Sequence, residues 1–294
     1  MKADGGRRKA ESQKLVATVV FACVLLALSG TSAAHAQALA PTTPFSATVP
    51  ILMYHHVGDA AMEKRGAIGA RYDISAADFD AQMAYLAGQG YTPVRVEQIA
   101  DALNDGAPLP ERPVAITFDD ANQDNFDHAF PILQKHHLFG TFFIVTRWVG
   151  TPDHLTWEEI AAMQRAGMRF GAHGLTHPWL TKLRLADAGR EIADSKADLE
   201  AHLGVPVRVF AYPYGGASPT VTKLVQDAGF VAALGTSPPR ITHTSAQRFC
   251  LTRLGIYRGA TLTGFAARLG SIARPPTQPV PHLVMVRHRG SLDE

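Results

Sequence analysis

The stretch VAITFDD, residues 114–120, joins a run of apolar and β-branched residues to two adjacent carboxylates. A continuous hydrophobic run of this length predicts a strand that is buried on both faces. In barrel-like α/β folds, reactive side chains gather where such strands end. Two neighbouring carboxylates disfavour joint ionisation unless a positive group compensates them. The stretch therefore predicts a core strand with a divalent cation at its end, and the alternative is an aspartate that caps the next helix.

The rest of the chain alternates between short apolar runs and helical patterns. From caps and periodicity, helices are expected at 76–88, 94–103, 126–137, 157–166, 185–203, 219–228 and 262–269. Further strands are expected at 49–54, 140–145, 168–173, 207–212, 230–234 and 249–256. Strands that alternate with helices predict an α/β fold with a parallel sheet, either open or closed into a barrel.

The N-terminus has the layout of a secretory signal peptide. Five basic residues precede an apolar run at 15–28, and Ala34-His35-Ala36 supplies a small-residue cleavage site. An uncleaved membrane anchor is the alternative. The first 36 residues carry five basic and two acidic groups, so the formal charge falls from +2 to −1 without them. Nothing in this balance indicates a nucleic-acid partner.

Composition and local sequence divide the chain into four parts. With 46% hydrophobic and 18% charged residues, it is an ordinary globular protein. We expect a signal peptide at 1–36, a flexible leader at 37–48, one domain at 49–271 and a Pro-rich, basic tail at 272–294. Only Cys250 would survive processing, so no intramolecular disulfide is expected and burial must stabilise the fold.

Two further segments carry polar chemistry at expected strand ends. His173 and His177 are four residues apart directly after the strand at 168–173. Two imidazoles and a carboxylate leave an open position on Zn²⁺, as catalytic sites require, and this ligand set suits zinc better than Mg²⁺ or Ca²⁺. The segment YPYGG at 212–216 follows the next strand and could present backbone N–H groups to a developing oxyanion. A structural histidine pair and an ordinary loop are the alternatives.

Together these segments resemble the polysaccharide deacetylases of carbohydrate esterase family 4. The first motif of that family, T-F-D-D, is matched by residues 117–120. The second, H-[ST]-x-x-H, is matched at His173 and His177, with Gly174 in place of the hydroxyl residue. The resemblance covers about residues 49–271 and implies a distorted (β/α) barrel of the polysaccharide deacetylase type.

The third family motif is matched only in part. Of R-x-P-Y, the chain keeps Pro213 and Tyr214, and Ala211 stands where the arginine belongs. The late L-x-H motif that supplies the general acid is not found. Instead, the domain opens with MYHHV at 53–57, which resembles the branch that deacetylates poly-β-1,6-N-acetylglucosamine, where an N-terminal Tyr-His supplies the acid.

The resemblance implies a role for each matched residue. Asp119 would be the general base, and the Tyr214 N–H, beside Pro213, would help to bind the oxyanion. His55 would be the general acid, with His56 as the other candidate. Arg253 is our hypothesis for the displaced arginine that orients Asp119. The implied ligands of Zn²⁺, for which Co²⁺ or Ni²⁺ could substitute, are Asp120, His173 and His177.

These assignments predict a metal-dependent hydrolase. It would remove N-acetyl groups from an extracellular or cell-envelope N-acetylglucosamine polymer, with the poly-β-1,6-linked form favoured. The alternatives are a deacetylase of peptidoglycan, chitin oligomers or O-acetylated xylan, and a catalytically silent glycan-binding domain. We expect a secreted or periplasmic monomer, attached to a membrane only through an uncleaved signal segment. Exopolysaccharide export machinery is the candidate partner.

Overall fold

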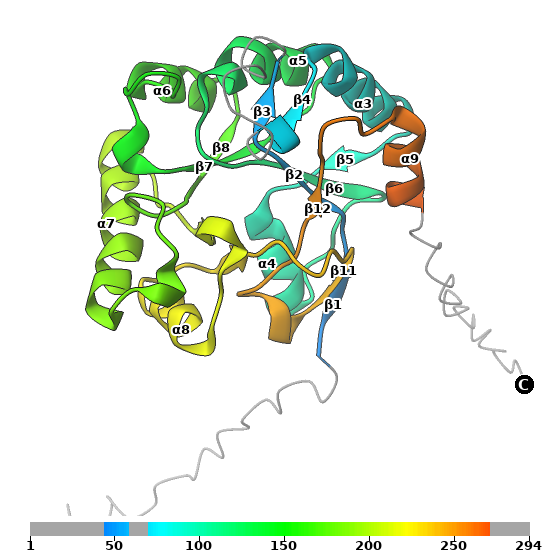
Figure 1. Ribbon diagram of the computed structural model, residues 1–294. Coiled ribbons are helices and arrows are strands. Elements are labelled where there is room, and N and C mark those ends of the chain that lie inside the picture. Colours follow the sequence, from blue (N-terminus) through cyan, green and yellow to red (C-terminus); the bar gives the residue numbers. More distant parts are fainter. Residues whose placement is uncertain (1–43, 59–69, 271–294) are drawn as a thin grey trace, which may run out of the picture. The chain divides into compact units, whose positions relative to one another are not determined.

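The computed structural model of the chain describes residues 44–58 and 70–270 (Figure 1). The expected signal peptide, the first residues of the leader and the expected C-terminal tail lie outside these ranges. None of the helices in the described ranges is both long and apolar enough to span a membrane.

The centre of the fold is an eight-stranded sheet in which every pairing is parallel. Its main path runs through seven strands in the following order: β10 (Ala232–Leu234), β9 (Val209–Ala211), β8 (Arg169–Ala172), β7 (Thr141–Ile144), β6 (Pro113–Phe118), β2 (Ile51–Tyr54) and β12 (Leu254–Gly255). The eighth strand, β5 (Thr92–Pro93), pairs with the start of β6. Strand β6 contains the apolar run and lies in the middle of the sheet, as its sequence predicts.

Residues 251–255 connect the two edges of this sheet. The N–H of Leu251 donates to the carbonyl of Ala233 in β10 at 2.9 Å, and its own carbonyl accepts from Gly235 at 2.7 Å. Three residues later, β12 pairs with β2. The sheet is therefore curled into a half-barrel whose open side is bridged by residues 251–255, which confirms the expected distorted barrel.

Helices surround the sheet in Figure 1, and three of those described begin at a side-chain cap that the sequence supplies. Ser75 caps one helix through the N–H of Asp78, and Thr156 and Glu159 form the expected capping box. Gly204 ends the longest helix in a left-handed conformation. The helices are α3 (Ala76–Gly88), α4 (Val96–Asp105), α5 (Phe130–Lys135), α6 (Trp157–Arg165), α7 (Leu185–Leu203), α8 (Pro219–Asp227) and α9 (Leu262–Gly270).

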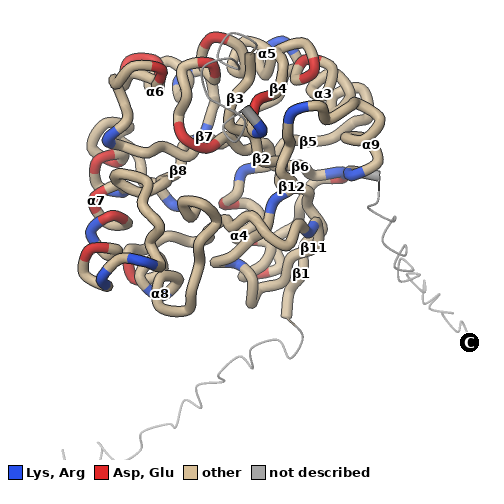
Figure 2. The backbone as a smooth tube through the Cα atoms, viewed as in Figure 1, with Lys and Arg blue, Asp and Glu red and all other residues tan. Residues whose placement is uncertain are grey.

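Charges of both signs alternate along α7 (Figure 2). Arg184 and Arg190 both pair with Asp187, and Lys196 pairs with Glu200. Such i,i+3 and i,i+4 pairs give a solvated helix face a small stabilisation, of about 0.2–0.5 kcal/mol each.

Two expectations about local structure are corrected. Residues 46–48, expected to be the end of a flexible leader, form strand β1 (Ser46–Thr48), which pairs antiparallel with β11 (Thr242–Thr244). The buried side chain of Ala47 and the 2.6 Å hydrogen bond from the Val49 N–H to the Ile241 carbonyl fix this pair. The helix expected at 126–137 is instead a π-helical turn, η2 (Asn125–Ala129), followed by α5, which has a proline in its first turn.

Candidate active site

The loops that follow β6, β8 and β9 meet at the C-terminal end of the half-barrel. They line a cavity of about 350 Å³ together with residues that follow β2 and β12. Every predicted site residue except Pro213 and Arg253 lines it. The full lining is Met53, His55, Tyr72, Asp119, Asp120, His173, His177, Trp179, Tyr212, Tyr214, Gly215, Thr236 and Tyr257.

Asp120, His173 and His177 bring one ligand atom each to a common point. Asp120 Oδ1 lies 3.6 Å from His173 Nε2 and 3.5 Å from His177 Nε2, and the two Nε2 atoms are 3.2 Å apart. Ligands about 2.0 Å from a tetrahedral ion are separated by roughly 3.3 Å. Asp120 Oδ1 is also buried and has no hydrogen-bond partner among the described residues. The donor set therefore fits a zinc-like cation.

The surroundings prepare these ligands for a cation. His173 Nδ1–H donates to the carbonyl of Ala211 at 2.8 Å, which leaves the Nε2 lone pair facing Asp120. Burial lowers the pKa of His177 to about 3, so the ring is neutral at neutral pH, as a ligand must be. Burial, and then the charge of Asp119, raises the pKa of Asp120 to about 7. A bound cation would keep this carboxylate ionised.

The backbone is strained at these same positions. Asp120, His177 and Tyr214 have φ angles of 77°, 62° and 59°, a region that residues other than glycine rarely adopt. Such conformations cost about 1 kcal/mol or more each and cluster at functional sites. Neither hydrophobic periodicity nor motif spacing in the sequence indicated this strain.

Asp119 is held by Arg253, and both side chains are almost fully buried. The guanidinium forms two parallel hydrogen bonds to the carboxylate, and a third, from Nη1, reaches Thr117 Oγ1 at 3.2 Å. Burial alone would raise the pKa of Asp119, but the charge of Arg253 and then that of His173 hold it well below its usual range. Asp119 Oδ2 lies 3.9 Å from both His55 Nε2 and His173 Nε2.

The two histidines at 55 and 56 have different surroundings. His55 lines the cavity, its ring lies 4.5 Å from that of Tyr72, and its Nδ1 is buried without a partner in the described part of the chain. Burial lowers the pKa of His55 to about 4, although Asp119 raises it. His56 does not line the cavity, and its Nδ1 lies 2.8 Å from Asp124 Oδ2. The structure therefore brings His55, rather than His56, to Asp119.

The third motif forms a short turn, η5 (Pro213–Gly215), at the cavity edge. Pro213 is buried, whereas the Tyr214 ring is half exposed and stacks on Trp179 with ring centroids 4.5 Å apart. Tyr214 also packs edge-on against His177 at 4.5 Å. Tyr72 and Tyr257 also line the cavity, with their ring centroids 5.6 Å apart, and Tyr72 packs against His55. Neither tyrosine belongs to a motif that sequence reasoning could have singled out.

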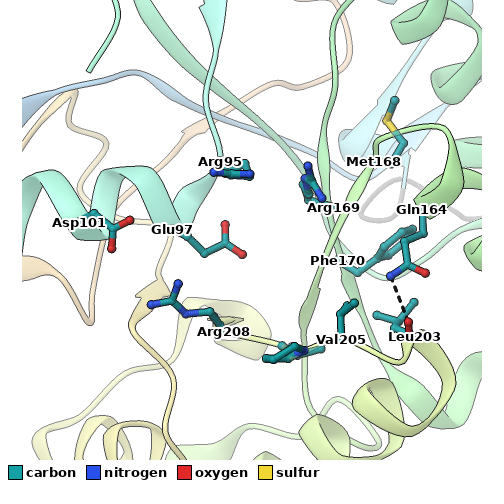
Figure 3. A pocket seen from close by; sticks show the side chains of 12 residues that line it. Arg95, Glu97, Asp101, Gln164, Met168, Arg169, Phe170, Leu203, Val205 and Arg208 are labelled. Atoms are coloured by element: carbon teal, nitrogen blue, oxygen red, sulfur yellow. Dashed lines mark hydrogen bonds between the residues drawn. The ribbon is translucent and has the colours of Figure 1, made fainter. Parts of the chain in front are cut away.

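A second cavity, of about 310 Å³, lies at the opposite end of the strands (Figure 3). Arg169, at the start of β8, and Arg208, just before β9, contribute to it, together with Glu97 and Asp101 of α4. It contains none of the predicted site residues. The chemistry of the three motifs therefore belongs to the cavity at the C-terminal end.

Comparison with known proteins supports the resemblance. Residues 106–233 match a family model described as polysaccharide deacetylase. The Bacillus subtilis protein YxkH is 26% identical over 226 residues, which cover 77% of each chain. The poly-β-1,6-N-acetyl-D-glucosamine N-deacetylase of Escherichia coli K12 is 25% identical over 279 residues, which cover 79% of this chain and 40% of that protein.

The fold is also shared with a solved deacetylase. The structure of Streptococcus pyogenes deacetylase PplD in complex with acetate matches with a TM-score of 0.71 and 25% identity, over 77% of this chain and 99% of that chain. The family match includes Asp119, Asp120 and both motif histidines, but it excludes His55 and Arg253.

Proposed function

Because the chain belongs to the polysaccharide deacetylase family, a family of hydrolases, we propose that it is a metal-dependent N-deacetylase of an N-acetylglucosamine polymer outside the cytoplasm. The favoured substrate is poly-β-1,6-N-acetylglucosamine, by analogy with the named activity of the E. coli relative. The observation that carries the proposal is the convergence of three metal-ligand atoms beside the buried, ionised carboxylate of Asp119.

Asp120, His173 and His177 would hold the metal, and the donor set favours Zn²⁺, with Co²⁺ or Ni²⁺ as substitutes. The metal would polarise the acetamide carbonyl and lower the pKa of the attacking water toward 7.

Asp119 is placed to take a proton from that water. Its low pKa makes it a weak base that releases the proton readily, and His55 Nε2 is 3.9 Å away. His55 is neutral at neutral pH, because its pKa is about 4, so it must gain a proton before it can give one. We propose that the proton passes from water through Asp119 to His55 and then to the leaving amine. The water oxygen first forms the new C–O bond, which gives a tetrahedral oxyanion. The oxyanion then collapses and the C–N bond breaks as the nitrogen gains the proton from His55, which yields acetate and a free amine.

The backbone N–H of Tyr214 is proposed to stabilise the oxyanion beside the metal, with Pro213 fixing the turn. One such donor contributes about 3 kcal/mol in comparable sites. The strained backbone at Tyr214 supports a functional role for this turn.

The cavity walls suit a sugar chain. Trp179 and Tyr214 form an exposed aromatic surface on the His177 side, and Tyr72 and Tyr257 lie on the His55 side. Aromatic faces bury large apolar areas against flat ligands such as sugar rings. One aromatic pair beside His177 and another beside His55 give a sugar chain two contact surfaces in one cavity, which favours an internal unit of a polymer over a free monosaccharide.

Acetate release from a panel of polymers tests the proposal. Full-length protein would be freed of metal with a chelator, reloaded with Zn²⁺ and assayed on poly-β-1,6-N-acetylglucosamine, peptidoglycan, chitin oligomers and acetylated xylan. We expect metal-dependent release that is fastest on the first polymer. Acetate release from only one of the other polymers would contradict the proposed substrate. Acetate release that continues after the metal is removed would contradict the proposed metal dependence. Sugar binding without any release would indicate a silent glycan-binding domain.

We also propose that the protein acts in the periplasm or after secretion, as a monomer, with exopolysaccharide export machinery as a candidate partner. The signal-like residues 1–36 support this location. Fractionation of cells that express the full chain tests it, and a wholly cytoplasmic protein would contradict it.

A further inference from the structure

One carboxylate, that of Glu191, binds the loop at 174–176, which joins the two ligand histidines. Glu191, on α7, accepts hydrogen bonds through Oε2 from the backbone N–H groups of Leu175 and Thr176, at 2.9 and 2.8 Å. Its Oε1 accepts from the Thr176 hydroxyl at 2.6 Å. All three donors lie between His173 and His177. No other side chain in the described residues binds this loop so extensively.

The loop conformation makes these contacts possible. Gly174 has a φ angle of 84°, which turns the next two N–H groups to the same side. Consecutive N–H groups in such a turn form a concave anion-binding site. A Cβ added at Gly174 would lie 3.5 Å from Glu191 Oε2, so the carboxylate packs directly against the glycine. Glycine itself offers no side-chain donor or acceptor to hold the loop.

The two ends of the loop are fixed to different degrees. His173 follows β8, its N–H donates to the Ile144 carbonyl, and its Nδ1–H donates to the Ala211 carbonyl. In the described part of the chain, His177 has no comparable hydrogen bond to a backbone carbonyl of a neighbouring strand. Its ring packs against His173, Trp148 and Tyr214, and its φ angle of 62° is unfavourable. The position of His177 therefore depends mainly on the loop before it.

We propose that Glu191 is a positioning residue that sets His177 as a metal ligand by fixing the loop at 174–176. This inference rests on the proposed function in its assumption that Asp120, His173 and His177 bind a metal. Removal of the carboxylate leaves two N–H groups and a hydroxyl without their acceptor. The N–H groups of Thr146 and Arg147 still donate to the carbonyls of Gly174 and Leu175. His177 is therefore less firmly held at the ligand position, while Asp120 and His173 stay in place.

Glu191→Ala tests the proposal, and Asp194→Ala is the matched control. Asp194 lies one turn further along the same helix and is exposed. It lines the same surface hollow as Leu175 and Thr176, but among the described residues it makes no hydrogen bond to the loop. Both variants lose one negative charge from α7, and only the first loses the loop contacts. Glu191→Gln removes the charge but keeps one acceptor oxygen for the N–H groups. It therefore measures how much of the Zn²⁺ affinity depends on the loop contacts rather than on the charge.

Three measurements on full-length protein separate the outcomes. We expect amide hydrogen exchange in the peptide around 173–178 of the metal-free protein to be at least about 10-fold faster in Glu191→Ala than in Asp194→Ala. Zn²⁺ affinity, measured by titration of the metal-free protein, should fall about 10- to 100-fold. Acetate release should fall at limiting Zn²⁺ and recover most of its kcat, with little change in KM, at saturating Zn²⁺.

Unchanged exchange or unchanged Zn²⁺ affinity in Glu191→Ala overturns the proposal. An equal loss in Asp194→Ala also overturns it, because the effect would then come from charge alone. If Glu191→Ala does not fold, the same two readouts on Glu191→Asp decide, because this variant keeps the charge but its shorter side chain cannot make the same contacts with the loop. Exchange and Zn²⁺ affinity equal to those of the unmodified protein would then count against the proposal. Since exchange and metal titration need no substrate, the proposed function can fail while this inference stands.

Discussion

The guanidinium of Arg253 donates two hydrogen bonds of 2.7 Å to the carboxylate of Asp119, from Nη1 to Oδ1 and from Nη2 to Oδ2. The two residues are 134 positions apart in sequence. They meet because residues 251–255 bridge the open side of the half-barrel next to β2, which itself pairs with β6. The closure of the fold and the orientation of the proposed base therefore depend on the same segment.

Arg253→Ala should lower kcat about 100-fold with unchanged metal content. Without the two hydrogen bonds from Arg253, the Asp119 carboxylate can rotate. A displacement of about 1 Å at a reacting group lowers the rate by about this factor. The buried charge left behind should also lower the free energy of unfolding by about 3 kcal/mol. Acetate release, metal analysis and denaturant unfolding check these effects.

Arg253→Lys should restore little activity, because an ammonium group cannot form the two parallel bonds. The exposed Arg258, five residues later, supplies the control, and Arg258→Ala should leave kcat and stability near those of the unmodified protein. Full activity of Arg253→Ala would show that the two hydrogen bonds from Arg253 are not needed to orient Asp119 as the base.

Asp119→Asn and Asp120→Asn should separate the base from the ligand. The first removes the proton acceptor and should lower kcat at least about 100-fold while Zn²⁺ remains bound. The second removes a charged ligand and should lower Zn²⁺ affinity as well as activity. His173→Ala should behave like Asp120→Asn. Parallel metal titration and acetate assays test this, and normal turnover by Asp119→Asn would contradict its assignment as base.

His55→Gln and His56→Gln form a matched pair for the proton donor. Only His55 lines the cavity and approaches Asp119, so its replacement should lower kcat about 100-fold with little loss of metal. His56→Gln should change kcat by less than about 10-fold, because His56 pairs with Asp124 outside the cavity. A larger loss in the His56 variant would move the proposed acid to that residue.

Much of the fold and of the site follows from local sequence, but not all of it. Caps at Ser75, Thr156 and Gly204 placed three helix ends correctly, because capping depends on a few adjacent residues. Adjacent motif residues such as Asp119 and Asp120 were likewise visible. The strand at 46–48 was missed, because its partner lies almost 200 residues away and its own sequence has little hydrophobic pattern.

Contacts between distant segments were also beyond local patterns. The position of Glu191 under the histidine loop depends on how α7 packs against β8, which neither periodicity nor capping specifies. Tyr72 and Tyr257 reach the cavity from segments without a chemical motif. The Arg253 hypothesis arose from a missing motif residue, and only the folded chain shows the contact with Asp119.

Trp179→Ala should raise KM for a polymer about 3- to 10-fold and leave kcat nearly unchanged. Trp179 is 42% exposed, stacks on Tyr214 and does not contact the proposed ligands, so its loss should weaken substrate binding alone. Trp157, which stacks on His202 away from the cavity, supplies the control through Trp157→Ala. Initial rates on oligomers of increasing length measure the effect, and a KM equal to that of the unmodified protein would exclude a stacking role.

His243 should make the fold sensitive to mild acid. Its side chain is buried in β11, and burial lowers its pKa from 6.5 to about 4. Between about pH 6.5 and pH 4, the unfolded chain therefore binds a proton at His243 that the folded chain does not bind. The contribution of the neutral, buried His243 to the free energy of unfolding is complete above pH 6.5 and is lost as the pH falls toward 4. At pH 5 the loss is about 2 kcal/mol relative to pH 7. His243→Gln, which does not titrate, should lose that much less stability over the same range in urea unfolding. Identical pH dependence in the two proteins would mean that His243 is as easily protonated in the folded chain as in the unfolded one.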